Sequence, residues 1–304
     1  MAEHVRFLES ELPFRPADEC RFHIIPVPCE ASVSYGGGTA LGPEAIVEAS
    51  SQLEVWTGRA EPSRQGIFTW PAVNCAGQTE CVLERIEQAV HTALGQGPQT
   101  GADMATMPTV PVVLGGEHTV SLGVLRALQK RYGSLGIIHF DAHADLRDVY
   151  EGTPLSHACV MRRAVQDLGL PLYQIGVRSL SPEEERYRRE QNIGHLDARE
   201  AKFPGFPASF ALPDTFPHNV YLSFDVDALD SSLMPATGTP EPGGLFWWDA
   251  LELVERSLQG RCCLGFDVVE LAPVASLHAP TYAAARLVYE IMGILAPVPL
   301  AGTV

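Results

Sequence analysis

The chain has 304 residues, of which 46% are hydrophobic and 19% are charged, and its formal net charge is −16. This composition is ordinary for a globular enzyme and excludes extensive disorder. The acidic balance excludes the basic footprint that is typical of a nucleic-acid-binding protein, although an acidic surface can attract small cations.

No window of the sequence approaches the roughly 18 consecutive apolar residues that a membrane helix needs. The stretch from Met1 to Ser10 lacks the basic start and the apolar run of a signal peptide. The seven cysteines are scattered, and no Cys-x-x-Cys pair indicates a zinc knuckle or a redox motif. We therefore expect no nucleic-acid partner, no membrane partner, and a cytoplasmic location with reduced thiols.

Short apolar runs of strand length recur along the chain, and segments of helical composition lie between them. The runs lie at 22–27, 110–114, 135–140, 172–177, 220–224 and 264–269. The helical segments lie at 43–51, 81–94, 121–132, 157–168, 182–191, 248–258 and 281–295. Apolar residues at consecutive positions are typical of strands that a parallel sheet buries on both faces. The alternation predicts an α/β fold, with three α/β/α layers around a central, mostly parallel sheet, in a single domain over residues 1–304.

Local signals mark two helix starts and three long loops. Pro43 fits the first turn of a helix, and Ser181 before Pro182 is a typical N-cap. The loops are expected at 95–108, 202–218 and 236–244. In open α/β sheets, ligands bind where strands end and loops begin, and every chemical motif of this chain lies at such a place.

The apolar run at 135–140 ends directly on Asp141, which is followed by His143 and Asp145. Alternate residues of extended backbone point to the same side, so these three side chains would converge beyond the end of the strand. A solvated loop would be the simpler explanation of a single Asp-x-His pair. The strand context and the third residue favour a set of metal ligands.

Two further strand ends carry residues of ligand type. Asp225 and Asp227 follow a run that is too apolar for an exposed strand, and buried carboxylates are paired or bind metal. Gly115 and Gly116 permit a tight turn before His118, at the mouth of a predicted helix. A single histidine in this position would more often be structural.

Together these strand ends offer two imidazoles and four carboxylates: His118, Asp141, His143, Asp145, Asp225 and Asp227. Mixed nitrogen and oxygen ligation suits Mn²⁺ or a similar divalent ion. Six ligands are more than one ion usually takes from a protein while keeping an open position, so we expect two ions that activate a water molecule. Glu270, at the end of the last strand, could clamp a planar guanidinium, although it could equally cap a helix or pair with an arginine.

These residues together resemble the ureohydrolase family, which includes arginases, agmatinases, guanidinobutyrases and formiminoglutamases. The similarity runs from about residue 26 to residue 295. Its motifs are Gly-Gly-Glu-His at 115–118, Asp-Ala-His-Ala-Asp at 141–145, Ser-Phe-Asp-Val-Asp-Ala-Leu-Asp at 223–230, Gly-Thr-Pro-Glu-Pro-Gly-Gly at 238–244 and Val-Val-Glu at 268–270. The resemblance implies a three-layer α/β/α domain with a binuclear manganese centre, in which the six residues above are the ligands of two Mn²⁺ ions.

The resemblance also implies catalytic roles. Glu270 matches the glutamate that holds the guanidinium of the substrate. Asp145 matches the carboxylate that passes a proton to the leaving amine. His157 looks like the family's proton-shuttling histidine at the substrate, although it could also be an ordinary histidine at a helix start.

The choice of substrate depends on two segments. Residues 146–154 lack the arginase pattern and are similar to agmatinases, as are residues 34–46. We therefore expect cleavage of agmatine to putrescine and urea, with another guanidino or formimino compound (guanidinobutyrate, arginine or formiminoglutamate) as the alternative. Agmatine is a small cation with a free amine, so Asp148, Glu151 or Glu30 could bind its far end.

Three departures from agmatinases leave the substrate open without affecting the expected ligands: Ser231, Ala236 and Ser276 stand where agmatinases commonly have Pro, Gly and Asp. A non-catalytic, partner-binding relative should have lost metal ligands, yet all six positions are filled. The family resemblance also implies a homo-oligomer, either a trimer or a hexamer.

Overall fold

A computed structural model describes residues 5–97, 108–202 and 210–296 of the chain. Its centre is a sheet with the strand order β2-β1-β3-β8-β7-β4-β5-β6, in which every neighbouring pair is parallel. The strands are β1 (Phe22–Val27), β2 (Ile67–Thr69), β3 (Val110–Gly115), β4 (Gly136–Phe140), β5 (Leu172–Ile175), β6 (Gly194–Leu196), β7 (Asn219–Asp225) and β8 (Cys262–Val269). The prediction of an α/β fold with a parallel sheet is confirmed.

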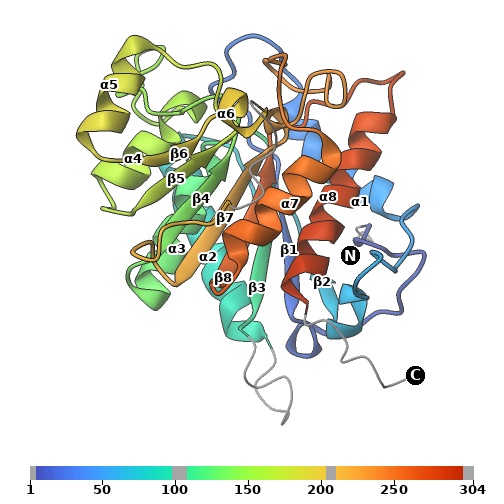
Figure 1. Cartoon of the computed structure of the whole chain (residues 1–304). Helices are drawn as coiled ribbons and strands as arrows, with labels where there is room; N and C mark the ends of the chain where they lie inside the picture. Colours follow the sequence, from blue (N-terminus) through green and yellow to red (C-terminus); the bar gives the residue numbers. More distant parts are fainter. Residues whose placement is uncertain (1–4, 98–107, 203–209, 297–304) are drawn as a thin grey trace.

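Helices cover both faces of this sheet (Figure 1). They are α1 (Gly42–Ser50), α2 (Thr79–Gln96), α3 (Val120–Tyr132), α4 (Val160–Gln166), α5 (Pro182–Glu190), α6 (Ala198–Lys202), α7 (Trp247–Leu258) and α8 (Ala279–Leu295). Buried side chains of α1, α7 and α8 share one apolar core, and those of α2, α3 and α4 share the other. The fold is therefore three-layered, as expected.

Side-chain alternation along the strands explains why two cores form. Ile24 of β1 lies in the core beneath α1 and α8, whereas its neighbour Ile25 lies in the core beneath α2. Both faces of a central strand must therefore be mostly apolar, which accounts for the predominantly apolar runs in the sequence. The two edge strands of the sheet, β2 and β6, have only three residues each. They were not predicted, because their residues form no apolar run.

The local signals also agree with the structure. The Ser181 hydroxyl accepts a hydrogen bond from Glu184 N at 3.2 Å, and the Glu184 carboxylate accepts one from Ser181 N at 2.8 Å, which forms a capping box. Pro43 lies in the first turn of α1. The loop at 236–244 contains no helix or strand, while parts of the other two expected loops, 98–107 and 203–209, lie outside the described residues. No described helix is both long and apolar enough to span a membrane.

Candidate active site

The candidate site lies at the carboxyl ends of four neighbouring central strands, β3, β8, β7 and β4. Because the strands are parallel, their carboxyl ends meet at the same edge of the sheet. This brings together His118 after β3, Glu270 after β8, Asp225 at the end of β7 and Asp141 after β4. All four are buried. Residues more than 150 positions apart in the sequence thus share one site, as with His118 and Glu270.

Three carboxylates surround the imidazole of His118. Its Nδ1 atom lies 3.2 Å from Asp141 Oδ2, 3.1 Å from Asp145 Oδ2 and 3.5 Å from Asp225 Oδ2. On the other side of the ring, Nε2 lies 2.8 Å from Ser223 Oγ. The Ser223 hydroxyl donates its hydrogen to Asp267, so it accepts the hydrogen of His118 Nε2.

This arrangement orients the ring for a cation. With its hydrogen on Nε2, His118 presents the lone pair of Nδ1 to the carboxylates, and that buried atom has no hydrogen-bond partner among the described residues. Burial and the neighbouring Asp227 and Asp141 carboxylates raise the pKa of Asp225 well above its usual value. A lone pair that converges with mutually repelling carboxylates is the donor set of a divalent metal ion.

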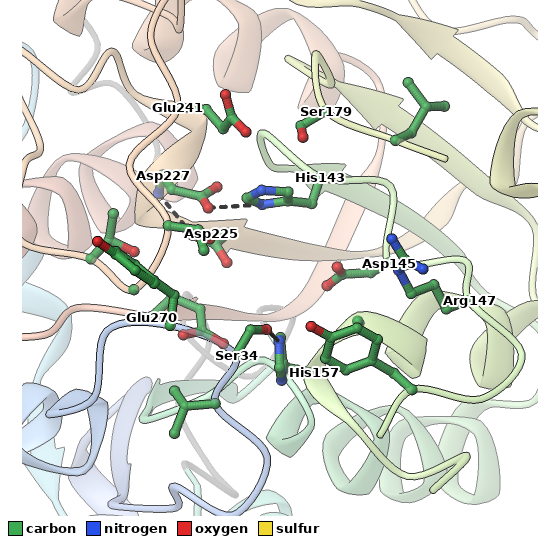
Figure 2. Close-up of a pocket in the computed structure, with 18 of the residues that line it drawn as sticks. Ser34, His143, Asp145, Arg147, His157, Ser179, Asp225, Asp227, Glu241 and Glu270 are labelled. Carbon is green, nitrogen blue, oxygen red and sulfur yellow. Dashed lines mark hydrogen bonds and ion pairs between the residues drawn. The ribbon is translucent and has the colours of Figure 1, made fainter. Parts of the chain in front are cut away.

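A second group of ligand type adjoins the first. His143 Nδ1 lies 3.0 Å from Asp227 Oδ2 and 3.5 Å from Asp141 Oδ1, and the dashed line from His143 to Asp227 in Figure 2 marks the shorter contact. The side chains of Asp141, His143 and Asp227 could together hold a metal ion, and so could those of His118, His139, Asp141 and Asp145. Asp141 belongs to both groups, so the residues fit a pair of ions that share this carboxylate.

His139 belongs to the first group of ligand-type residues, and the sequence analysis did not select it. Its Nε2 atom lies 2.9 Å from Asp141 Oδ2, while its Nδ1 atom accepts a hydrogen bond from the Gln174 amide at 3.1 Å. The Nε2 hydrogen therefore points to Asp141 and holds that carboxylate in place. The alternation that selected Asp141, His143 and Asp145 extends back to position 139, so the signal was present in the sequence.

Two of the acidic residues have a strained backbone conformation. Asp145 has a φ of 53° and Glu270 a φ of 66°, both in the left-handed region that side chains with a Cβ seldom adopt. The Glu270 carboxylate accepts a hydrogen bond from His118 N at 2.7 Å, and burial raises its pKa to about 8. Such strain costs on the order of 1–3 kcal/mol and is typical of functional sites.

His157 also lines the cavity, and its ring takes part in a chain of hydrogen bonds. Its Nδ1 atom lies 3.1 Å from Ser32 Oγ, and its Nε2 atom lies 2.6 Å from Ser34 Oγ. The Ser32 hydroxyl in turn donates to the buried Glu117 carboxylate at 3.0 Å, which also accepts from Ser32 N and Ala31 N. Sequence reasoning missed Glu117, Ser32 and Ser34, because their roles depend on contacts between segments about 85 and 125 residues apart.

The cavity at this site has a volume of about 390 Å³. It is lined by His143, Asp145, His157, Asp225, Asp227 and Glu270 (Figure 2), together with Ser34, Arg147, Ser179 and Glu241. His118 and Asp141 lie behind this surface, almost fully buried. The structure therefore brings together all six expected metal ligands and both further catalytic candidates.

The structure does not bring the three expected tail-binding acids to the cavity. Asp148 forms an ion pair with Arg163, and the Glu30 carboxylate accepts hydrogen bonds from Gly38 N and Ala40 N. Glu151 is exposed on a turn. All three lie in the described part of the chain, and none lines the cavity. Charge alone suggested them, and charge does not reveal which acids already have partners.

A model of the arginase family matches residues 20–293. The chain is 38% identical over 299 residues to an N(1)-aminopropylagmatine ureohydrolase of Synechocystis sp., a match that covers 95% of this chain and 93% of the relative. The chain belongs to the arginase family. Another family relative, an agmatinase of Pyrococcus horikoshii, is 30% identical over 96% of this chain and 98% of its own length.

Structural comparison agrees with this membership. The crystal structure of an agmatine ureohydrolase of Thermoplasma volcanium superposes with a TM-score of 0.81 at 28% identity, covering 96% of this chain and 95% of that one. The chain is thus an arginase-family hydrolase with a binuclear metal centre, and it cleaves a guanidino substrate. The expected family, fold and reaction type are confirmed.

Proposed function

We propose that this enzyme hydrolyses the guanidino group of an amine-terminated alkylguanidine, which is agmatine or its N1-aminopropyl derivative. The products are urea and a polyamine, putrescine or spermidine respectively. The observation that supports this most strongly is that Glu270 shares one cavity with the two groups of ligand-type residues. The cavity therefore offers a binding site for a guanidinium cation beside a metal centre.

Each residue of the site has a proposed task. His118, Asp141, His143, Asp145, Asp225 and Asp227 would hold two Mn²⁺ ions, since the donor set of nitrogens and carboxylate oxygens suits that metal. When bound, the two ions would supply a nucleophilic hydroxide near neutral pH. Glu270 Oε1 is occupied by His118 N, which leaves Oε2 to accept hydrogen bonds from the guanidinium.

Two further residues would handle protons. Asp145 lies at the cavity wall and would pass a proton to the leaving amine. His157 Nε2 faces the Ser34 hydroxyl inside the cavity, while Nδ1 is held by Ser32 on the buried Glu117. A substrate that displaces the Ser34 hydroxyl would exchange a proton with Nε2, while Ser32 keeps the ring in place.

The aminopropyl derivative is the second candidate because of the relatives. N(1)-aminopropylagmatine ureohydrolases of Synechocystis sp. and Thermococcus kodakarensis are 38% and 33% identical to this chain. We further propose that residues 1–304 form one domain of a trimer or hexamer that acts in polyamine biosynthesis. The free cysteines support a reducing, cytoplasmic location.

The test is a substrate panel with purified enzyme and added Mn²⁺. Agmatine, N1-aminopropylagmatine, 4-guanidinobutyrate and arginine are assayed for urea, and formiminoglutamate is assayed for formamide. We expect urea from one or both of the first two substrates at the highest kcat/KM. Preference for arginine, guanidinobutyrate or formiminoglutamate would contradict the proposal.

A further inference from the structure

Six carboxylates line the active-site cavity: Asp145, Glu184, Asp225, Asp227, Glu241 and Glu270. Asp145, Asp225 and Asp227 contact the two histidines of the metal site. Glu184 accepts hydrogen bonds from Leu146 N and Ser181 N, and Glu270 accepts one from His118 N. The side chain of Glu241 has no hydrogen-bond or ion-pair partner among the described residues.

The backbone around Glu241 is held firmly, although its carboxylate is free. The guanidinium of Arg178 donates to Glu241 O at 2.9 Å and to Asp227 O at 2.7 Å. Asp230 Oδ2 accepts hydrogen bonds from Gly243 N at 2.8 Å and Gly244 N at 3.0 Å, just beyond Glu241. A carboxylate on a fixed loop beside a cavity is already oriented for a ligand, so little entropy is lost when it binds one.

The charges of the cavity leave two anions unbalanced. Two divalent ions would neutralise the four carboxylates of the metal site, and the hydroxide bound to them would add one further negative charge. Glu184 lies 4.0 Å from the guanidinium of Arg147, so these two charges offset one another. The remaining lining carboxyl groups are Glu241 and Glu270, and a guanidinium bound at Glu270 would hold that group in its ionised form. A substrate that complements this cavity therefore carries at least two positive charges.

The two anions lie at opposite sides of the cavity. In Figure 2, Glu241 lies near Ser179 at one edge, Glu270 lies near Ser34 and His157 at the other, and His143, Asp225 and Asp227 lie between them. A guanidinium held at Glu270 would thus leave Glu241 for a second cation at the end of an alkyl chain. This is the charge pattern of an amine-terminated guanidine.

The geometry points to Glu241 as the residue that selects the substrate by binding the amine of its tail. This inference rests on the proposed function and adds the specificity determinant to it. It explains why an amine tail would be preferred over a carboxylate tail of similar length, since a carboxylate would face the unpaired anion of Glu241. It also places the tail site on the loop between β7 and α7, away from Asp148 and Glu151.

The test compares three substrates that share the guanidino group and differ in the charge of the tail. They are agmatine or its aminopropyl derivative, neutral butylguanidine and anionic 4-guanidinobutyrate. We expect Glu241→Gln to lower the kcat/KM ratio of the amine-tailed substrate over butylguanidine by about tenfold, mainly through KM. Glu241→Lys should raise the relative activity on 4-guanidinobutyrate, and Glu241→Asp should keep part of the original preference.

The control is Glu183→Gln, which removes the same charge from an exposed position on α5 that does not line the cavity. It should leave the ratio as in the wild type, because a long-range effect of net charge is screened by salt. An unchanged ratio in Glu241→Gln, with urea still released from agmatine, would overturn the role of Glu241 and leave the proposed function intact. If the wild-type enzyme released no urea from any amine-tailed substrate, both would fall.

Discussion

The contacts and the pKa of the Asp227 side chain are set by the residues around it. Its buried carboxylate contacts the partly exposed His143 at 3.0 Å and accepts a hydrogen bond from Ala142 N at 2.9 Å. Burial, the largest cause, and the nearby Asp141 carboxylate raise its pKa. A bound cation would offset both effects, so we expect Asp227 to be a metal ligand.

Replacing Asp227 therefore tests the second metal position. We expect Asp227→Ala to lower the metal content by about one ion per chain and kcat by at least about a thousandfold, because one ion loses its ligand. Elemental analysis after gel filtration measures the first effect and urea release the second. The exposed Asp214 supplies the control, Asp214→Asn. Full activity in Asp227→Ala would exclude Asp227 as an essential ligand.

His23 is a buried histidine outside the site, and it makes folding sensitive to pH. Its Nε2 atom donates to Cys20 O at 3.0 Å, and its Nδ1 atom accepts from Trp70 Nε1 at 3.1 Å. Burial lowers its pKa below 6.5, so the folded state holds the neutral ring. The unfolded state binds the proton more readily, and this part of the stability is present above pH 6.5 and lost as pH falls below it.

We expect the stability advantage of the wild type over His23→Gln to shrink by up to about 1.4 kcal/mol between pH 7.5 and pH 5.5. Urea denaturation of both proteins at each pH measures this difference. Metal loss at low pH affects both proteins and cancels in the comparison. A difference that does not change with pH would show that the unfolded and folded states bind this proton equally.

At the scale of elements, the ends of helices and strands support the cavity wall. The capping box of α5 joins Ser181, which lines the cavity, to Glu184, and Glu184 in turn accepts a hydrogen bond from Leu146 N in the segment after the metal-binding motif. One helix N-terminus therefore stabilises both itself and a neighbouring loop.

We expect Ser181→Ala to lower the free energy of unfolding by about 1 kcal/mol, because the N-cap hydrogen bond of α5 is lost. Ser181→Asp should retain most of the stability, since a carboxylate can cap the same N–H group and also favours the helix dipole. Chemical denaturation compares the three proteins. Equal midpoints for wild type and Ser181→Ala would mean that the cap adds nothing measurable.

At the scale of the whole molecule, metal ions at the proposed site would link segments that follow different strands of the sheet. The proposed ligands lie at or just after the end of β3, which is beside β1, and of β7 and β4, on the other side of β8. Without a cation, the buried carboxylates of Asp141, Asp145, Asp225 and Asp227 face one another. Binding of metal to the folded state alone must then stabilise the whole fold.

We expect chelation of the metals to lower the thermal unfolding midpoint by about 5 °C or more, since metal at 100 times its Kd contributes about 2.7 kcal/mol. Calorimetry of chelator-treated protein, before and after addition of excess Mn²⁺, measures the shift. Asp227→Ala should gain less than the wild type on addition of Mn²⁺. If the midpoint were independent of Mn²⁺, the cluster would not be a metal site.

The sequence by itself determined the central strands and the fold class, and it singled out the residues of ligand type that the structure brings together. Strands buried on both faces are mostly apolar, so β1, β3, β4, β5, β7 and β8 are visible as runs. The ligand-type residues follow those runs, where parallel strands end together. Local pattern is sufficient for these features because each depends on residues next to one another in the chain.

Only the tertiary structure decided which of the remaining polar residues are free and which are paired. Asp148, Glu30 and Glu241 look alike in sequence, yet Asp148 has an arginine partner, Glu30 has backbone partners, and Glu241 has its side chain unpaired in the cavity. The support of His157 by Glu117 through Ser32 is hidden for the same reason. Such partners lie on different segments of the chain, and only their packing in three dimensions brings them within a hydrogen bond's length.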